Sequence, residues 1–213
     1  MGLHLYLLRH GETTFSQTGS YCGQLDPDLT PAGQQMAVEF AQAYRQVPWR
    51  AIFSSPLRRT VATAKPLAEA VGLGIELRDG LREAHYGAWE GQTPDWVKAH
   101  YLEDYIRWMT DPAWNAPTGG GETAVQVANR ALPVIAEIEA TYPEGHVLVV
   151  SHKATLRIIL CSLLGIDLGR YRDRINVLVA SVSVIRFTQY GPLLERMGDR
   201  SHLNPELRAL PGT

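Results

Sequence analysis

Short runs of apolar residues alternate along the chain with segments in which apolar residues recur every three or four positions. The first run, Leu3–Leu8, is continuous and stops at Arg9, which predicts a buried strand that opens into a loop. Runs over 50–54, 75–77 and 146–151 predict three further strands. All-apolar strands such as the last are typical of a parallel sheet that is covered on both faces.

Helical patterns lie between these strands. Thr30 followed by Pro31 predicts the start of a helix that extends to about Gln46. Further helices are predicted over 57–71, near 95–109, over 122–141 and over 154–164, with Pro133 either kinking or splitting the fourth. Two last strands are expected over 180–187 and 193–197, and the residues from 198 to 213 are expected to be an irregular tail.

This alternation of strands and helices predicts one α/β domain over 1–213 with a mostly parallel sheet. The composition, 45% hydrophobic and 20% charged, is ordinary for a soluble globular enzyme. A formal charge of −2 gives no global attraction to nucleic acid or to an anionic membrane, so we expect neither as a partner. The two cysteines form no disulfide framework, and with no signal-like segment they indicate a cytoplasmic protein.

Cationic and imidazole side chains follow three of the predicted strands. Arg9 and His10 come directly after the first strand, Arg59 lies at the start of the helix after the second, and His152 follows the strand over 146–151. Ligands of open parallel sheets bind beyond the carboxyl ends of the strands, where these side chains would converge. Arginine forks, imidazoles and helix N-termini at one edge predict a site for a phosphate dianion.

The chemistry of such a site needs a nucleophile and an acid. We predict that His10 is the nucleophile, because a neutral imidazole attacks phosphorus and divides one hard displacement into two easier ones. Glu83, in a loop after a short strand, is the best candidate for the acid that protonates the leaving alkoxide. No metal or other cofactor is expected, because the candidate ligands lie beside arginines that repel a cation.

Each of these residues is weak evidence alone. A single histidine at a strand end is more often structural, and an arginine such as Arg59 is more often a solvated helix residue. The tryptophans between Trp89 and Trp114 are expected to belong to the core or to the wall of the pocket, rather than to a surface on which bases stack. What predicts a site is the combination of His10, His152 and the arginines, which follow separate strands.

The same segments resemble the histidine phosphatase superfamily, the phosphoglycerate mutase-like enzymes. Leu8–Thr13 resembles the Arg-His-Gly motif of that family, which implies that His10 becomes phosphohistidine, and 54–64 resembles a second motif, which implies that Arg59 binds phosphate. Glu83 stands where the family has its acid, 120–123 resembles a segment before a family helix, and 149–152 resembles the last motif. The resemblance extends from Leu5 to about Asn204 and implies a three-layer α/β/α sandwich.

Two positions depart from the family pattern. Ser16 stands where the family often has an asparagine that touches the phosphate, so a shorter hydroxyl would have to reach it directly or through water. Lys153 stands where many members have glycine. If its side chain points inward it adds a cation to the pocket, and the sequence leaves the outward orientation equally open.

The resemblance also implies which residues surround the substrate. Cys22, Gly23 and Gln24 occupy the loop that closes over the substrate phosphate, with Cys22 as a small packing residue. His85 and Tyr86 are expected at the mouth of the pocket, against the part of the substrate that is not phosphate.

Three activities are compatible with these motifs: a phosphatase for a small phosphorylated metabolite, a mutase, and a non-catalytic module that binds phospho-ligands. The segment between Glu83 and Glu122 is short compared with the covering insertion of mutases, which favours the phosphatase. Segments 25–29, 164–168 and 201–204 resemble bacterial metal-independent phosphoserine phosphatases, so phosphoserine is the first expected substrate and a homodimer is expected by the same resemblance. Phosphoglycerates, α-ribazole phosphate and sugar phosphates are alternative substrates that the sequence leaves open.

Overall fold

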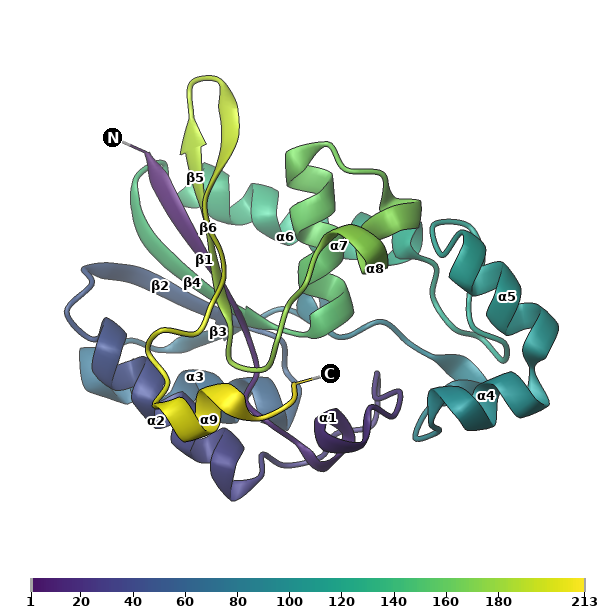
Figure 1. The fold of residues 1–213 in the computed structure, drawn as a ribbon. Coiled ribbons are helices and arrows are strands. Elements are labelled where there is room, and N and C mark those ends of the chain that lie inside the picture. The colour runs from purple at the N-terminus through teal and green to yellow at the C-terminus, as the bar shows by residue number, and fades with distance from the viewer. Residues whose placement is uncertain (1, 213) are drawn as a thin grey trace.

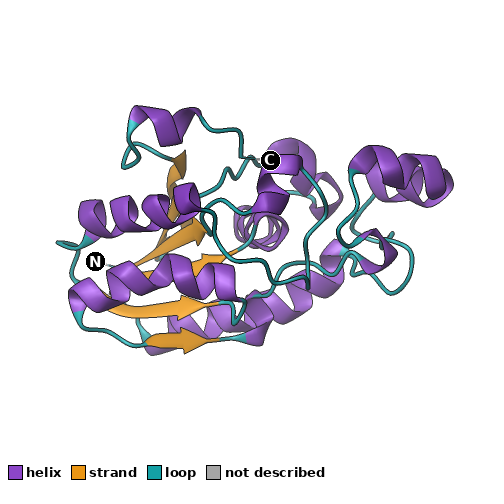
Figure 2. Ribbon diagram, turned by 90° about the horizontal axis from the view of Figure 1, so that it is seen from below, coloured by secondary structure: helices purple, strands orange, loops and turns teal. Residues whose placement is uncertain are grey.

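The structure, a computed structural model that describes residues 2–212, has a six-stranded sheet between two layers of helices (Figures 1 and 2). The spatial order of the strands is β3-β2-β4-β1-β5-β6. β4 pairs in parallel with β1 and β2, and β2 pairs in parallel with β3, whereas β5 and β6 are added as antiparallel neighbours. The strands are β1 (Leu3–Arg9), β2 (Trp49–Ser54), β3 (Ile75–Leu77), β4 (Gly145–Ser151), β5 (Val182–Thr188) and β6 (Gly191–Asp199).

The helices differ widely in length, and the longest follow the predicted segments. Among the described residues they are α1 (Thr14–Thr18), α2 (Pro31–Tyr44), α3 (Arg58–Val71), α4 (Pro94–His100), α5 (Leu102–Thr110), α6 (Ala124–Thr141), α7 (Lys153–Leu164), α8 (Tyr171–Arg174) and α9 (Pro205–Ala209). Three single 3₁₀ turns lie at Asp79–Leu81, Gly87–Trp89 and Leu168–Arg170.

The two faces of the sheet pack against different helices. Leu5 and Leu7 of β1 belong to a core that they share with α6 and α7, and Val149 of β4 joins them. Leu8 and Val150 belong to a separate core with α2 and α3 on the other face. The apolar strands thus supply both cores by the two-residue alternation of a strand. The three-layer α/β/α arrangement with a mostly parallel sheet is confirmed.

Several elements differ from the sequence-based prediction. The helix expected near 95–109 is two helices, α4 and α5, because Tyr101 between them has a non-helical backbone with φ −138° and ψ 43°. Pro133 lies inside α6 without splitting it. The tail expected to be irregular contains α9, which Asn204 caps through the Leu207 N–H and Pro205 opens at its first position.

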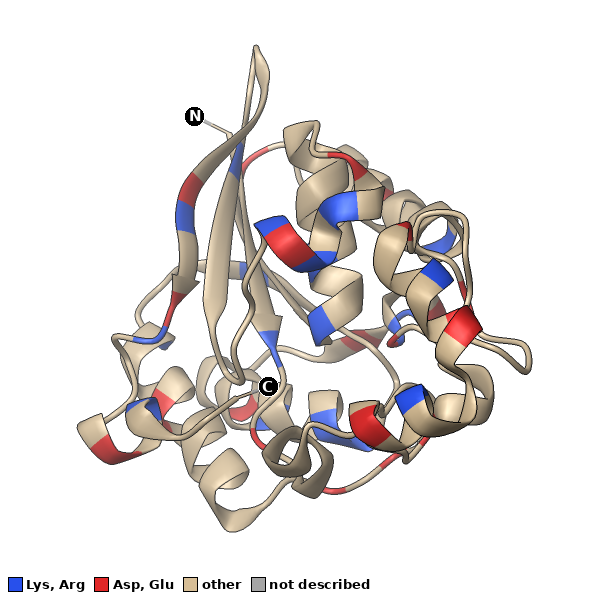
Figure 3. Cartoon of the chain, turned by 45° about the vertical axis from the view of Figure 1, so that its right-hand side comes forward, with Lys and Arg blue, Asp and Glu red and all other residues tan. Residues whose placement is uncertain are grey.

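The short helix α9 packs on the body of the domain. Leu203 and Leu207 bury their side chains against Met36 of α2 and Val179. Lysine, arginine, aspartate and glutamate are distributed over all parts of the ribbon, with both signs interspersed (Figure 3). Within residues 2–212, no helix is both long and apolar enough to cross a membrane.

Candidate active site

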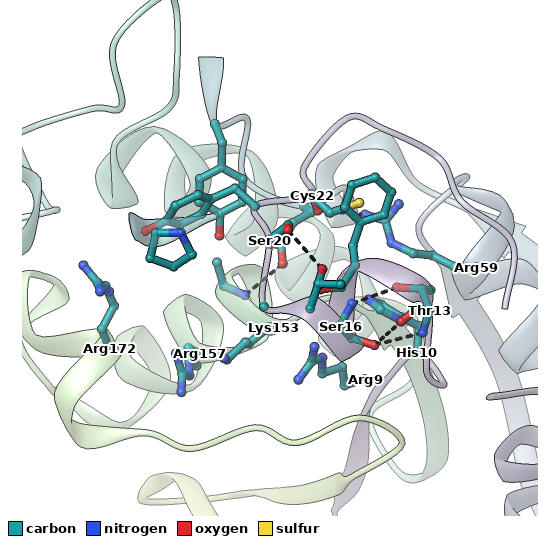
Figure 4. Close-up of a pocket in the computed structure, with 18 of the residues that line it drawn as sticks. Arg9, His10, Thr13, Ser16, Ser20, Cys22, Arg59, Lys153, Arg157 and Arg172 are labelled. Carbon is teal, nitrogen blue, oxygen red and sulfur yellow. Dashed lines mark hydrogen bonds between the residues drawn. The ribbon is translucent and has the colours of Figure 1, made fainter. Parts of the chain in front are cut away.

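A cavity of about 360 Å³ lies beyond the carboxyl ends of β1 and β4. This is the edge of the sheet where Arg9 of β1 is in register with Ser151 of β4. Arg9, His10, Arg59 and Glu83 all line the cavity, and Figure 4 shows the first three of them. Its volume is in the usual range for a site that holds one small ligand.

His10 is held in the form that a nucleophile requires. Its Nδ1 lies 2.7 Å from the carbonyl oxygen of Gly11. A carbonyl only accepts, so Nδ1 carries the hydrogen and Nε2 keeps its lone pair. Burial, with the neighbouring Arg59 and Arg9 cations, lowers the pKa of His10 well below its ordinary 6.5. The imidazole is therefore neutral and nucleophilic at pH 7.

The backbone around His10 is tightly packed. A Cβ atom on Gly11 would overlap the carbonyl oxygen of Gly33, which explains why glycine follows the histidine. The Gly11 N–H donates to Thr63 Oγ1 at 3.0 Å, and the Ala180 N–H donates to the His10 carbonyl at 3.1 Å. Ala180 adopts a left-handed backbone with φ 51°, a strained conformation for alanine at the edge of the site.

Arg9 fixes two loop segments beside the nucleophile, one that precedes β5 and one that follows α9. Its Nη1 donates to the carbonyl oxygen of Val177 at 2.9 Å and to that of Gly212 at 3.4 Å. Burial lowers the pKa of Arg9 to about 9, with the Glu83 carboxylate opposing this shift. The guanidinium stays charged at pH 7, and the last described residues of the tail reach the site.

His152 lies behind His10 and does not line the cavity. The two imidazole centroids are 5.3 Å apart and meet edge to face. His152 is completely buried, and its burial and the nearby Arg59 lower its pKa well below 6.5. The two histidines are therefore neighbours. His10 faces the cavity, and His152 packs against His10 from the buried side.

Arg59 connects this buried layer to the loop over 22–26. Its Nη1 donates to the carbonyl oxygen of Leu25 at 2.7 Å, and its Nη2 donates to that of Gly23 at 3.0 Å. The side chain is buried, and it lines the cavity. Arg59 thus fixes this loop beside the pocket, which Cys22 lines, as well as adding positive charge to the pocket.

Glu90 holds the same loop from the other side. Its carboxylate accepts the N–H groups of Gly23 at 3.0 Å and Gln24 at 3.1 Å, and also that of Tyr86 at 3.0 Å. Four donors converge on it when Leu25 at 3.4 Å is included. Sequence reasoning missed Glu90 because its partners are distant backbone groups, which leave no pattern in the sequence.

Glu83 is held at the N-terminus of α7. Its Oε1 accepts the N–H groups of Ala84 at 2.9 Å and Thr155 at 3.1 Å, and its Oε2 accepts that of Ala154 at 3.1 Å. Oε1 also lies 3.2 Å from the Thr155 hydroxyl. Among the described residues Oε2 has the fewer partners, so it is the oxygen that can exchange a proton with a ligand.

Arg130 fixes the backbone that carries Glu83. Its Nη2 donates to the Glu83 carbonyl at 2.9 Å and its Nη1 to the Arg82 carbonyl at 2.8 Å. An ion pair of 2.8 Å with Glu122 orients the guanidinium. Glu122 in turn accepts the His85 N–H at 2.9 Å. The segment over 120–123 thus helps to hold the loop that carries Glu83 and His85.

Ser16 and Cys22 both line the cavity. The Ser16 hydroxyl accepts the Thr13 N–H at 2.9 Å, and the Ser16 N–H donates to Thr13 Oγ1 at 3.3 Å, which forms the capping box of α1. The Ser16 hydroxyl also donates to the Thr13 carbonyl at 2.9 Å. Burial raises the pKa of the Cys22 thiol to about 11, so the thiol is neutral at pH 7.

Three residues expected around the substrate lie outside the cavity. The Gln24 side chain donates to the Glu83 carbonyl at 3.0 Å, and Gly23 meets Glu90 and Arg59 through its backbone. The His85 ring points to the Gly120 carbonyl, with Nδ1 at 2.8 Å. The described lining includes none of them, and the loop that carries His85 is held against the Gly119–Gly121 turn.

Tyr86 and Lys153 do line the cavity, so the side chain of Lys153 takes the inward orientation. Two further cations line it that sequence reasoning missed, Arg157 of α7 and Arg172 of α8. Trp108 forms part of the wall, as expected of the tryptophan-rich segment. Within 2–212 we find no group of three or more acidic, histidine or cysteine side chains placed to hold a metal ion.

Comparisons with known proteins agree with this geometry. Residues 5–200 match the family model of the histidine phosphatase superfamily (branch 1). The chain is 34% identical to phosphoserine phosphatase 1 of Hydrogenobacter thermophilus over 93% of each chain. It is 30% identical to the probable phosphoglycerate mutase GpmB of Erwinia tasmaniensis, covering 94% of this chain and 95% of that one. The structure of Bacillus stearothermophilus YhfR superposes with a TM-score of 0.88 at 28% identity, covering 95% of this chain and 100% of that one.

Proposed function

This chain belongs to the histidine phosphatase superfamily and is a phosphomonoesterase, and we propose that it hydrolyses a small-molecule phosphomonoester through a phosphohistidine on His10. The observation that carries the mechanism is the state of His10. Its Nδ1 hydrogen is directed to Gly11, which leaves a neutral Nε2 in a cavity beside the guanidinium groups of Arg9 and Arg59.

In the first step His10 Nε2 attacks phosphorus. The N–P bond forms, the P–O bond to the alcohol breaks, and Glu83 Oε2 gives a proton to the departing oxygen. Arg9 and Arg59 stabilise the charge on the three equatorial phosphoryl oxygens. Neutral His10 is essential here, because a protonated imidazole has no lone pair for the attack.

In the second step a water molecule attacks the phosphohistidine. Glu83 takes a proton from the water as its oxygen bonds to phosphorus, the N–P bond breaks, and inorganic phosphate leaves. His10 returns to its neutral form and Glu83 to its protonated form, so the cycle is balanced. No step in this scheme uses a metal ion.

Phosphoserine is the first substrate that we propose, because the relative from Hydrogenobacter thermophilus carries that name and aligns along 93% of the chain. A mutase is the alternative, since the relative from Erwinia tasmaniensis is named as one. The small cavity, with a loop fixed beside it by Arg59 and Glu90, supports a small phosphorylated metabolite rather than a macromolecule.

The test is phosphate release by the purified protein from a panel of phosphorylated metabolites and an aryl phosphate, with a chelator present throughout. We expect metal-independent release that His10→Ala lowers by about 10⁴-fold or more. Rapid quenching should trap a phosphoryl group that is stable in alkali and lost in acid. Retained turnover in His10→Ala, or loss of activity in chelator, would contradict the mechanism.

The mutase alternative has its own measurement. The enzyme is incubated with 3-phosphoglycerate and a trace of the bisphosphate, and both isomers and free phosphate are followed. A phosphatase releases phosphate with little isomerisation, and the opposite outcome assigns a mutase. We also propose a cytoplasmic homodimer. Gel filtration with light scattering tests the dimer, and a reducing compartment agrees with two unpaired thiols, Cys22 and Cys161.

A further inference from the structure

Three cationic side chains line the part of the cavity formed by α7 and α8. Lys153 and Arg157 are four residues apart on α7, so they lie on one face of that helix, and Arg172 comes from α8. In Figure 4 they extend away from His10, with Arg172 at the far end of the pocket. None of the three is needed to stabilise the transferred phosphoryl group in the mechanism above.

In the described lining these three cations have only Glu83 as a nearby opposite charge. Among residues 2–212, none of them makes a hydrogen bond or an ion pair with another side chain or the backbone; Arg157 Nε and Arg172 Nη1 are buried without a partner. Glu83 is the single acidic residue in the described lining, and its oxygens already accept the N–H groups of α7. Buried guanidinium nitrogens without partners are costly unless a ligand supplies an acceptor and the opposite charge.

The lowered pKa of Lys153 agrees with a site that binds an anion. Burial lowers its pKa to about 7, and repulsion from Arg9 and Arg157 adds to that shift. Burial also lowers the pKa of Arg157. A bound anion would offset the repulsion and restore the full charge of the lysine.

The geometry of Arg172 indicates which kind of anion fits. Its guanidinium carbon lies 3.7 Å from the centroid of the Trp108 ring, so the planar group stacks on the indole. A guanidinium that is held by its face presents its edge, and the edge matches two oxygens of an oxyanion, either a carboxylate or a phosphate. Tyr86 and Tyr171 limit the space around it on the same wall.

We propose that Lys153, Arg157 and Arg172 form a second anion subsite, which binds a carboxylate that the substrate carries beside its phosphate ester. This inference rests on the proposed phosphatase function. The substrates it selects are phosphorylated hydroxy acids, and phosphomonoesters without a second anionic group are discriminated against.

Matched substrate pairs test the subsite. 3-Phosphoglycerate and glycerol 3-phosphate differ in one carboxylate, as do phosphoserine and phosphoethanolamine. We expect the wild-type protein to favour the carboxylate member of each pair in kcat/KM by about tenfold or more. Arg172→Gln and Arg157→Gln should each lower that ratio by about tenfold, mainly through a higher KM for the carboxylate substrate.

Arg174→Gln is the matched control, because Arg174 lies on the same short helix α8 and is exposed. We expect it to leave the ratio within about twofold of wild type. Equal ratios in Arg172→Gln and Arg174→Gln, or no preference within the wild-type pairs, would overturn the subsite. Thermal unfolding of each variant verifies that it is folded.

A binding measurement separates the subsite from the catalytic proposal. Calorimetry of His10→Ala with 3-phosphoglycerate and with glycerol 3-phosphate reports the carboxylate preference without turnover. Tight binding of 3-phosphoglycerate that Arg172→Gln weakens would support the subsite even if no phosphate were released. A bisphosphate that binds more tightly than 3-phosphoglycerate would show that the subsite takes a second phosphate, and would overturn the carboxylate assignment.

Discussion

The Nε–H of Arg59 points at Nδ1 of His152 across 3.2 Å, a contact that places an arginine and a histidine 93 residues apart in one buried unit. An arginine only donates, so Nδ1 of His152 is the acceptor and its Nε2 carries the hydrogen. Nε2 then donates to Ser55 Oγ at 2.8 Å. The tautomer of His152 is thus fixed by Arg59, and its neutral charge agrees with its low pKa.

Arg59→Lys should disable the enzyme while Arg58→Lys does not. A lysine cannot reach His152 and the carbonyls of the loop over 22–26 together, so the pocket loses the anchor of this loop and one bidentate cation. We expect kcat/KM to fall by about 10²-fold or more, which corresponds to about 3 kcal/mol. Arg58 is the control because 63% of its side chain is exposed against 1% for Arg59. Similar losses in the two variants would contradict the assignment.

Glu90→Gln should loosen the loop over 22–25. The amide nitrogen of glutamine would face backbone N–H groups that now meet a carboxylate oxygen. We expect the free energy of unfolding to fall by about 1–3 kcal/mol and KM to rise several-fold, measured by urea denaturation and steady-state kinetics. Glu103→Gln, at an exposed position of α5, should change neither quantity, and an equal effect there would argue against the clamp.

Arg130→Met should act on catalysis through Glu83. Arg130 is absent from the described lining of the cavity and holds the Glu83 backbone, so its loss displaces the acid. Protonation matters most for a poor leaving group, so kcat for an alkyl phosphate should fall about tenfold more than kcat for p-nitrophenyl phosphate. Arg130→Lys should recover part of the difference. A uniform loss for both substrates would assign Arg130 a role in stability alone.

The stability of the protein should decrease as the pH falls below about 6.5. Burial lowers the pKa of His202 to about 4, while Asp199 and Glu39 oppose the shift. An unfolded histidine binds its proton near pH 6.5, so between that pH and the folded pKa the unfolded state takes up more protons and gains stability. The stabilisation is complete above that window and is lost on acidification.

His202→Phe isolates this effect, because His202 packs edge to face against the rings of Phe40 and Tyr44, which stack on each other. The free energy of unfolding should drop between about pH 7.5 and 5 by about 1–2 kcal/mol less in the variant than in wild type. Urea denaturation at the two pH values measures it. An unchanged pH dependence would show that other groups, His10 and His152 among them, account for the acid sensitivity.

The sequence could predict the parts of the site that belong to regular elements. Arg9 and His10 follow an unbroken apolar strand, and the parallel sheet then requires that they meet the residue after β4, His152. Arg157 and Arg172 could not be predicted in this way. α7 is buried over most of its length, and the four-residue α8 is too short to produce a periodic pattern.

Side-chain direction was the second limit. His85 and Gln24 lie close to the site in the sequence but point to backbone carbonyls, and the Ser16 hydroxyl caps its own helix. Which acceptor a polar side chain selects depends on loops that the folded sheet brings together, and spacing in the sequence does not encode it. The helix in the tail, α9, was missed for a related reason. Asn204 and Pro205 are typical of a helix start, but a helix of five residues is too short to show a helical periodicity in the sequence.

The cavity holds five of the 20 lysines and arginines of the protein and, within the described part, one of its 22 acidic residues. A molecule with net charge −2 therefore concentrates positive potential in one recess. Such a recess focuses field lines, so small anions should associate faster at low ionic strength, with a rate that falls steeply as salt screens the field. A long polyanion meets the mixed outer surface instead and gains little from it. The local field in the recess therefore favours the association of small anions over large ones, before either contacts His10.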